Sequence, residues 1–334
     1  MSTTRIAING FGRIGRNTLR AIVESGRSDL EIVAINDLAA PETAAHLLEF
    51  DSVQGRFPAP VALRGDALDI GRGPIRMSAI PDPTQLPWED VDIVLECTGV
   101  FRHRDKARLH LQNGSKRVLV SAPSKGADRT VVYGVNHDRL TGDDVIVSNA
   151  SCTTNCLAPV AQVLHDAIGI VRGFMTTVHS YTVSQPALDR AAGSLYRSRA
   201  AALNIVPTST GAAKAIGLVL PALDGRLDGM AVRVPSPAVS MIDLSFDAAR
   251  DTTAEEITEV MQAAANGPLQ GVLATCCRDL VSMDFRHDPH SAIYASDQTR
   301  VQDGRFVRVL AWYDNEWGFS NRMADTAAAM GALL

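Results

Sequence analysis

Residues 8–15 read INGFGRIG, and this stretch decides the fold of the first half of the chain. A β-rich stretch, 5–9, leads into the glycines, and a helix-forming stretch, 14–25, follows them. Glycines spaced in this way between a strand and a helix are typical of a dinucleotide-binding βαβ unit. The N-terminus of the helix then faces the phosphates with its unpaired N–H groups.

Each glycine of the stretch has its own expected task. Gly10 permits the tight turn, Gly12 lets the backbone approach a pyrophosphate, and Gly15 allows close packing of helix on sheet. Asp37 lies about 20 residues further on, where an acid that binds the ribose is expected. A carboxylate there accepts a hydrogen bond from the 2′-OH of NAD and repels the 2′-phosphate of NADP. We therefore expect NAD as the cofactor, and dual use of NADP stays open.

The rest of the first half alternates short strands with longer segments. Their nearly continuous Val, Ile and Leu content is typical of strands buried on both faces. Further strands are expected at 31–36, 91–98, 117–121, 131–135 and 145–148, with a helix at 105–112. This rhythm predicts an α/β fold with a Rossmann-type, doubly wound parallel sheet.

The second half has a different pattern, and we place the domain boundary near Ala150. Several of its expected strands alternate apolar and polar residues, which predicts an α+β domain with a largely antiparallel or mixed sheet. These strands are 173–179, 230–234, 240–246, 281–285, 291–294 and 306–313. Helices are expected at 253–265 and 320–333, and residues 180–203 form a long loop, a feature that is often functional.

Composition excludes several classes of protein. The 334 residues carry a net charge of −5, so the chain lacks the basic footprint of a nucleic-acid binder. It has no apolar run long enough for a membrane helix and no signal-peptide pattern. Five cysteines in a chain of this length do not indicate a disulfide framework or a metal site. We expect a cytoplasmic enzyme with reduced thiols.

Residues 148–156 read SNASCTTNC and form the second focus of the sequence. Cys152 falls between an expected strand and a helical pattern at 157–168, where the helix dipole favours a thiolate. Ser151 and Thr153 add donors suited to an anion. Cys156 is one helical turn further on and is expected to pack in the core. Pro159 predicts a bend or irregularity in this helix.

His179 ends the β-rich run 175–178. An imidazole at the end of a strand can reach a thiol in a cleft, raise its thiolate population, and serve as a general acid and base near neutral pH. Sequence alone does not show whether His179 and Cys152 meet.

Several ordered motifs together resemble the phosphorylating glyceraldehyde-3-phosphate dehydrogenase family. The resemblance extends from about Arg5 to about Met330. It rests on the stretches 8–16, 148–159, 176–182, 209–215, 233–235 and 312–318.

The resemblance implies a role for each matching residue. Cys152 would be the nucleophile that forms a thiohemiacetal and then a thioester, and His179 would activate its thiol and take the hemiacetal proton. Inorganic phosphate would release the acyl phosphate. The implied NAD contacts are Gly10, Gly12, Arg13, Ile14, Gly15, Asp37, Ser121 and Asn315. Thr182 and Arg233 would bind the substrate phosphate. Ser151, Thr153, Arg197, Thr210 and Gly211 would bind the substrate and inorganic phosphate.

The resemblance also implies domains and partners. It gives an NAD-binding domain at 1–150, a catalytic domain at 151–315, and a C-terminal helix at 316–334 that returns to the first domain. It implies a homotetramer in which loop 180–203 packs near a neighbouring cofactor. Phe319 replaces a tyrosine common in the family, and Pro81 replaces a basic residue often found beside the adenine.

Two other functions stay open. Residues 131–136 and 287–293 are similar to the related erythrose-4-phosphate dehydrogenases, whereas Thr182 and the stretch 209–214 oppose that assignment. A catalytically idle NAD-binding interaction protein is a second alternative of a different class. The intact set of catalytic residues disfavours it.

Overall fold

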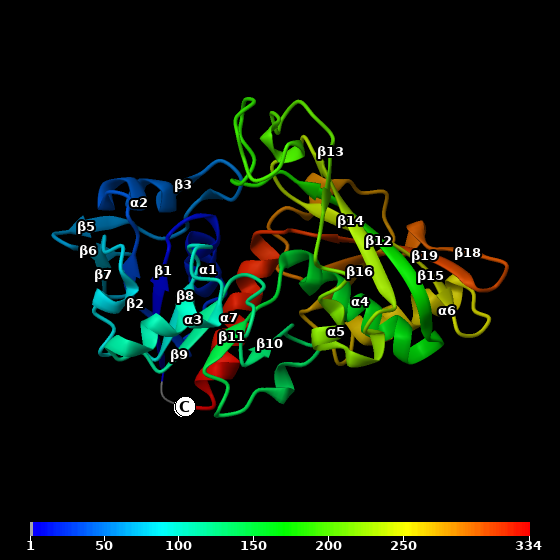
Figure 1. Cartoon of the computed structure of the whole chain (residues 1–334), viewed down its shortest axis with the longest axis horizontal. Coiled ribbons are helices and arrows are strands. Elements are labelled where there is room, and N and C mark those ends of the chain that lie inside the picture. Colours follow the sequence, from blue (N-terminus) through cyan, green and yellow to red (C-terminus); the bar gives the residue numbers. More distant parts are fainter. Residues whose placement is uncertain (1–2) are drawn as a thin grey trace. The chain divides into compact units, whose positions relative to one another are not determined.

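The computed structural model describes residues 3–334, which divide into two compact units (Figure 1). The first unit holds the described residues up to Tyr133, together with His137–Ser151 and Ser320–Leu334. The second unit holds Gly134–Asn136 and Cys152–Phe319. The chain therefore leaves the first unit just before Cys152 and returns to it within its last helix.

A nine-stranded sheet forms the centre of the first unit, in the order β10-β11-β9-β8-β1-β2-β7-β6-β5. Every neighbouring pair from β10 to β7 is parallel, and only the β7–β6 and β6–β5 pairs are antiparallel. The strands are β1 (Thr4–Asn9), β2 (Leu30–Asn36), β5 (Ala62–Arg64), β6 (Ala67–Asp69), β7 (Pro74–Ser78), β8 (Ile93–Glu96), β9 (Arg117–Val120), β10 (Arg129–Thr130) and β11 (Ile146–Ser148). The predicted doubly wound, parallel fold is confirmed.

The connections of this sheet carry its helices. They are α1 (Arg13–Glu24), α2 (Pro41–Glu49), η1 (Pro83–Gln85), α3 (Arg104–Ala107), η2 (Arg108–Asn113) and η3 (His137–Arg139), besides a small hairpin of β3 (Phe50–Asp51) and β4 (Gly55–Arg56). The last helix, α7 (Trp317–Gly331), joins this unit through its C-terminal part. There Arg117 Nη1 donates to the Met330 carbonyl at 2.7 Å, and Thr326 Oγ1 donates to Asn149 Oδ1 at 2.8 Å.

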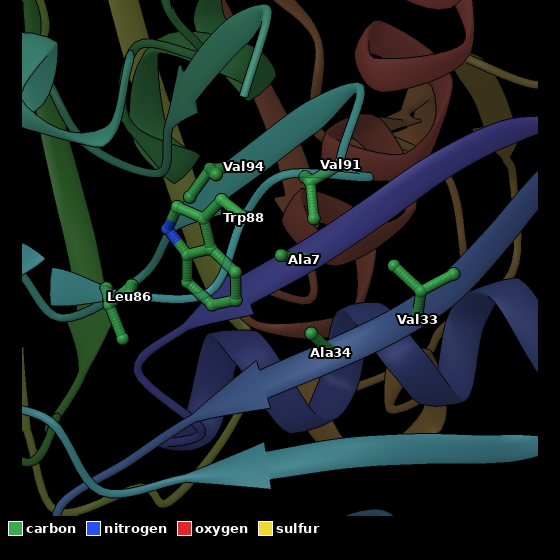
Figure 2. Packing of buried hydrophobic residues seen from close by; sticks show 7 residues of the cluster. All are labelled: Ala7, Val33, Ala34, Leu86, Trp88, Val91 and Val94. Atoms are coloured by element: carbon green, nitrogen blue, oxygen red, sulfur yellow. The ribbon is translucent and has the colours of Figure 1, made fainter. Parts of the chain in front are cut away.

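An apolar cluster lies between strands β1, β2 and β8 and the segment that precedes β8 (Figure 2). The indole of Trp88, which is fully buried, is its largest side chain. Its other members are Ala7, Val33, Ala34, Leu86, Val91 and Val94. Burying a side chain of this size contributes about 2–3 kcal/mol, so the cluster fixes the segment 86–91 on the sheet.

The second unit is built on an eight-stranded mixed sheet in the order β13-β14-β12-β15-β19-β17-β16, with β18 paired to β19. Two of its pairs, β12–β14 and β16–β17, are parallel and the others are antiparallel. The strands are β12 (Ile170–Ser180), β13 (Val206–Ser209), β14 (Leu227–Val234), β15 (Ser240–Ala248), β16 (Leu273–Cys276), β17 (Ala292–Ala295), β18 (Arg300–Gln302) and β19 (Phe306–Tyr313). The predicted mixed sheet is confirmed.

Helices α4 (Cys152–Ile168), α5 (Ile216–Val219) and α6 (Ala254–Ala265) belong to the same unit, with the short turns η4 (Tyr196–Ser198), η5 (Pro221–Leu223), η6 (Ser282–Phe285) and η7 (Ser296–Gln298). The expected start of α6 is confirmed, because Thr253 Oγ1 accepts a hydrogen bond from the Glu256 N–H. Helix α4 continues through Pro159 without interruption, so no break in the helix is seen at that residue. Residues 181–205 form the predicted long loop, broken only by η4.

Three local predictions are wrong for identifiable reasons. Residues 131–135 are not a strand, because the chain turns at Gly134 with a φ of 88°. Residues 281–285 form a 3₁₀ turn, since the carboxylate of Asp284 accepts the Val281 N–H at 2.8 Å and closes it. The helix expected at 105–112 is one turn of α-helix followed by a 3₁₀ segment.

Candidate active site

The glycine loop has the geometry that its sequence predicts. Gly10 adopts a φ of 92°, and a Cβ there would lie 2.6 Å from the Thr98 nitrogen. A Cβ on Gly15 would lie 2.2 Å from the Gly10 carbonyl oxygen. No side chain fits at either position, so the turn and the close helix packing both require glycine. A Cβ on Gly12 would meet open space, and Gly12 lines the adjoining pocket.

A pocket of about 390 Å³ opens beside this loop in the first unit. Asp37 lies in its wall, with one carboxylate oxygen accepting the Phe11 N–H at 2.6 Å and the other accepting the Ala39 N–H at 2.9 Å. Other lining residues include Asn9, Gly10, Gly12, Asn36, Pro81, Thr98 and Phe101. A fixed carboxylate beside a glycine loop and the N-terminus of α1 fits the ribose and phosphates of a dinucleotide.

The remaining predicted cofactor residues of this unit surround the pocket without lining it. The Arg13 guanidinium forms an ion pair with Asp51. Ile14 belongs to the first turn of α1, whose N–H groups have no acceptor within the helix. Ser121 lies beside the thiol of Cys97, and Cys97 does line the pocket.

Cys152 is the first residue of α4, as the sequence predicts. The backbone turns into the helix at Ala150, which has a φ of 55° although it carries a Cβ. Such left-handed residues outside glycine are uncommon and store strain near functional groups. The turn places the Cys152 thiol Sγ 3.5 Å from Nε2 of His179.

His179 is almost fully buried near the end of β12. Its Nδ1 lies 2.7 Å from the Ser180 carbonyl oxygen, and Nη1 of Arg233 approaches the same Nδ1 to 2.6 Å. Nδ1 cannot both donate to Ser180 and accept from Arg233. Donation to Ser180 leaves Nε2 with a lone pair toward Cys152, and this is the tautomer in which the imidazole can take the thiol proton.

Electrostatics in the site favour an uncharged pair before an anion enters. Burial raises the pKa of the Cys152 thiol, although the charge of Arg233 opposes that shift. Burial and then the charge of Arg233 lower the pKa of His179 to about 3. These directions oppose the expected thiolate and the expected titration near neutral pH. The main physical reason is burial of both groups, and for His179 the charge of Arg233, which the sequence alone did not place against the ring, acts in the same direction.

The predicted anion-binding residues differ in how closely they approach the thiol. Arg233 lies directly opposite His179 in the register of β14 and β12. Arg197 is near enough for its charge to act on both His179 and Arg233, and its Nε donates to Thr208 Oγ1 at 3.1 Å. The hydroxyl of Thr153 is hydrogen-bonded to the hydroxyl of Tyr313.

Two of the other predicted substrate residues, Thr182 and Thr210, make local contacts. Thr182 Oγ1 and Ser184 Oγ are 2.9 Å apart, and Thr210 Oγ1 accepts the Ala212 N–H. Gly211 is exposed. Ser151 precedes Cys152 and is grouped with the first unit.

The structure adds supporting residues that the sequence did not single out. The Tyr313 hydroxyl lies 2.9 Å from Oγ1 of both Thr153 and Thr177, and its ring meets His179 edge-on. Oδ1 of Asn315 accepts hydrogen bonds from the hydroxyls of Ser180 and Ser240, which orients the amide and leaves its Nδ2 hydrogens for other partners. Tyr313 belongs to the quoted stretch 312–318, which was its only sequence signal.

Two kinds of feature are absent from residues 3–334. No helix within that range is long and apolar enough to cross a membrane. In the same part of the chain, no three His, Cys, Asp or Glu side chains are arranged to hold a metal ion.

A dinucleotide pocket on a parallel sheet and a histidine-paired cysteine define an NAD-dependent oxidoreductase. Two family models match the chain, "Glyceraldehyde 3-phosphate dehydrogenase, NAD binding domain" over residues 4–104 and "Glyceraldehyde 3-phosphate dehydrogenase, C-terminal domain" over residues 151–315. The chain is 68% identical to glyceraldehyde-3-phosphate dehydrogenase of Cereibacter sphaeroides, over 99% of this chain and 100% of the relative. It is 62% identical to the enzyme of the same name from Xanthobacter flavus, over 99% of both chains. The chain therefore belongs to the glyceraldehyde-3-phosphate dehydrogenase family, and its cofactor is NAD.

Proposed function

We propose that the protein oxidises D-glyceraldehyde 3-phosphate to 1,3-bisphosphoglycerate with NAD and inorganic phosphate. The observation that carries the proposal is the 3.5 Å approach of Cys152 Sγ to His179 Nε2 beside the guanidinium of Arg233. A thiol with an adjacent base is suited to attack an aldehyde. A buried cation is suited to hold the phosphate of that aldehyde.

The first step joins Cys152 to the substrate. Sγ forms a bond to the aldehyde carbon while its proton passes to Nε2 of His179. The carbon–oxygen double bond opens, and His179 gives the same proton to the oxygen, which yields a thiohemiacetal and a neutral imidazole. A substrate phosphate near Arg233 would neutralise the charge that holds the pKa of His179 down. Binding of the substrate would therefore make the imidazole a better base when it is needed.

The second step leaves a thioester on Cys152. Bound NAD would supply the acceptor for the hydride that leaves the thiohemiacetal carbon. His179 takes the hydroxyl proton of the thiohemiacetal as the carbon–oxygen double bond forms. Phe11 and Ala39 hold the carboxylate of Asp37 ready for the ribose, and the Asn315 amide is proposed to orient the nicotinamide amide.

The last step releases the product. An oxygen of inorganic phosphate attacks the thioester carbon, the bond from carbon to Sγ breaks, and a proton returns to the thiolate from His179. Arg233 with Thr182 is proposed to hold the substrate phosphate. The site for the attacking phosphate would be formed by Ser151, Thr153, Arg197, Thr210 and Gly211. Nε of Arg233 is buried and has no hydrogen-bond partner within residues 3–334, which supports an anion as its missing partner.

We also propose a homotetramer located in the cytoplasm. The long loop exposes large apolar side chains, with Val183 86%, Leu195 90% and Ile205 71% exposed. A second copy of the chain would cover them, since contiguous exposed apolar side chains indicate an interaction surface. The cytoplasmic location agrees with the five cysteines, all of which are free thiols. Light scattering of the purified protein measures the oligomer directly.

Withholding inorganic phosphate tests the chemistry. With glyceraldehyde 3-phosphate and NAD alone, we expect the phosphoglyceroyl thioester to accumulate on the peptide that carries Cys152. Intact-mass and peptide-mass measurements detect it, and added phosphate should remove it within the time of turnover. Cys277→Ser is the matched control, because Cys277 is exposed and distant in sequence from the site. An acyl group on any other residue, or none on Cys152, would contradict the mechanism.

A further inference from the structure

A row of polar side chains, of which all but the last are buried, crosses the carboxyl ends of four neighbouring strands in the first unit. The strand order is β8-β1-β2-β7, and the row runs from Glu96 through Asn9 and Asn36 to Ser78. Asn9 Nδ2 donates to Glu96 Oε2 at 2.7 Å, Asn36 Nδ2 donates to Asn9 Oδ1 at 2.8 Å, and Ser78 Oγ donates to Asn36 Oδ1 at 2.9 Å. Each member thus fixes the orientation of the next.

Glu96 is the anchor of this row. Its carboxylate is 1% exposed and accepts four hydrogen bonds. Oε1 accepts from the N–H and the hydroxyl of Thr98, while Oε2 accepts from Asn9 and from Nε2 of His110 at 2.9 Å. A carboxylate has about four acceptor positions, so the group is saturated by donors in its ionised form.

His110 and Trp88 complete the support from behind. Nε1 of the Trp88 indole donates to Nδ1 of His110 at 3.2 Å, and both side chains are fully buried. An indole N–H only donates, so Nδ1 must accept and the ring hydrogen must sit on Nε2, facing Glu96. The apolar cluster around Trp88 holds the indole in this orientation (Figure 2). We call Glu96, His110 and Trp88 the buried triad.

The buried triad does not line the pocket, but the side chains that it fixes do. Asn9, Asn36 and Thr98 are lining residues, whereas none of the triad is. The His110 ring also meets Phe101, another lining residue, edge-on at 6.0 Å between ring centres. Without the indole N–H, the His110 ring could carry its hydrogen on either nitrogen. The donors around Glu96 would then be held less firmly, and Thr98 and Asn9 could move out of the positions that a ligand requires.

We propose that the buried triad is a positioning device that sets the affinity of the pocket for the adenosine half of NAD. The inference rests on the proposed placement of that half beside Asp37. Pre-oriented polar groups lower the entropy lost on binding, so affinity depends on residues that never touch the ligand.

The test compares Trp88→Phe with Val91→Ala. Both change a side chain of the same apolar cluster, but only Trp88→Phe removes the donor to His110. We expect Trp88→Phe to raise the Kd for NAD and for ADP-ribose roughly tenfold, with kcat at saturating NAD retained. Val91→Ala should lower the melting temperature while leaving both Kd values unchanged. Equal Kd values for the two variants would overturn the inference.

Two further measurements keep the result decisive. The ¹⁵N shifts of the His110 ring should report the Nε2–H tautomer in the wild type and a mixture in Trp88→Phe, and a wild-type ring protonated on Nδ1 would contradict the assignment. Asp37→Ala separates failure of the inference from failure of the pocket. If Asp37→Ala leaves NAD affinity unchanged, the proposed adenosine site is wrong. If only Trp88→Phe has no effect, the pocket stands and the triad has no positioning role.

Discussion

The dinucleotide pocket and the thiol site satisfy their polar groups in opposite ways. Behind the pocket, Glu96 is surrounded by donors, and in the pocket wall Asp37 is held by two N–H groups. In the thiol site, two neutral reactive groups lie against the Arg233 guanidinium, whose Nε has no partner within the described chain. The carboxylates of the first site are held by protein donors, whereas the buried guanidinium of the second keeps one nitrogen without a hydrogen-bond partner within residues 3–334.

This difference assigns cofactor affinity to the pocket and chemical reactivity to the thiol site. A pocket whose polar groups are already oriented loses less entropy when it binds its cofactor, so its affinity for that cofactor is higher. In a site with an uncompensated cation, the pKa values of the neighbouring groups change when an anionic substrate enters.

Cys152→Ser should abolish dehydrogenase activity, by about 10⁴-fold or more, because a hydroxyl is a much poorer nucleophile than a thiol. NAD affinity should be unchanged, because the pocket on the first unit is built without Cys152. Steady-state rates and calorimetric titration with NAD measure the two properties. Residual activity near that of the wild type would remove Cys152 from the mechanism.

His179→Asn should lower kcat by about 10²–10⁴-fold, since the general base is lost. It should also move the alkylation of Cys152 by iodoacetamide to higher pH, because burial raises the thiol pKa and no imidazole is left to take the proton. The rate of alkylation against pH, with and without the substitution, is the measurement. Superimposable profiles would contradict the proposed proton transfer.

Arg233→Gln should reduce kcat/KM for the triose phosphate by roughly 10²-fold, the usual scale for losing a buried charge-assisted contact. It should also raise the pKa of His179 from about 3, since the positive charge of Arg233 is, after burial, the largest cause of that low value. Titration of the His179 ring by NMR gives the sign. Inorganic phosphate should raise the same pKa in the wild type, and no movement in either experiment would refute the account of a site that lacks an anion.

Asp37→Ala should weaken NAD by about tenfold and improve NADP relative to NAD, because the carboxylate no longer meets the ribose or repels a 2′-phosphate. The ratio of kcat/KM for the two cofactors is the readout. The alkylation profile of Cys152 serves as the control and should not change. An unaltered cofactor ratio would show that the ribose lies elsewhere.

The sequence predicts most of the pocket and less of the thiol site, and the reason is distance along the chain. Gly10, Gly15 and Asp37 follow a local spacing that any strand–turn–helix unit imposes. Arg233 meets His179 only because β12 and β14 pair in parallel with one particular register, which no local pattern encodes. The lowered pKa of His179 arises from its burial and then from that pairing, neither of which a local pattern encodes, so the sequence leads to the opposite expectation.

The polar row beneath the pocket was equally hidden. Asn9 and Asn36 each look like an ordinary polar residue at the end of a strand, and Glu96 and His110 lie in separate segments. Only the strand order brings them into one hydrogen-bonded row. The wrong strand at 281–285 has the reverse cause, because a single local carboxylate overrides an alternating pattern.

The most direct test of the proposed function is the rate of NADH formation by the purified protein with NAD. Glyceraldehyde 3-phosphate and erythrose 4-phosphate are compared, each with and without inorganic phosphate. We predict fast turnover of the triose phosphate that depends on inorganic phosphate, and little turnover of the tetrose phosphate. Preference for the tetrose phosphate, or turnover of the triose phosphate that ignores phosphate, would contradict the proposed reaction.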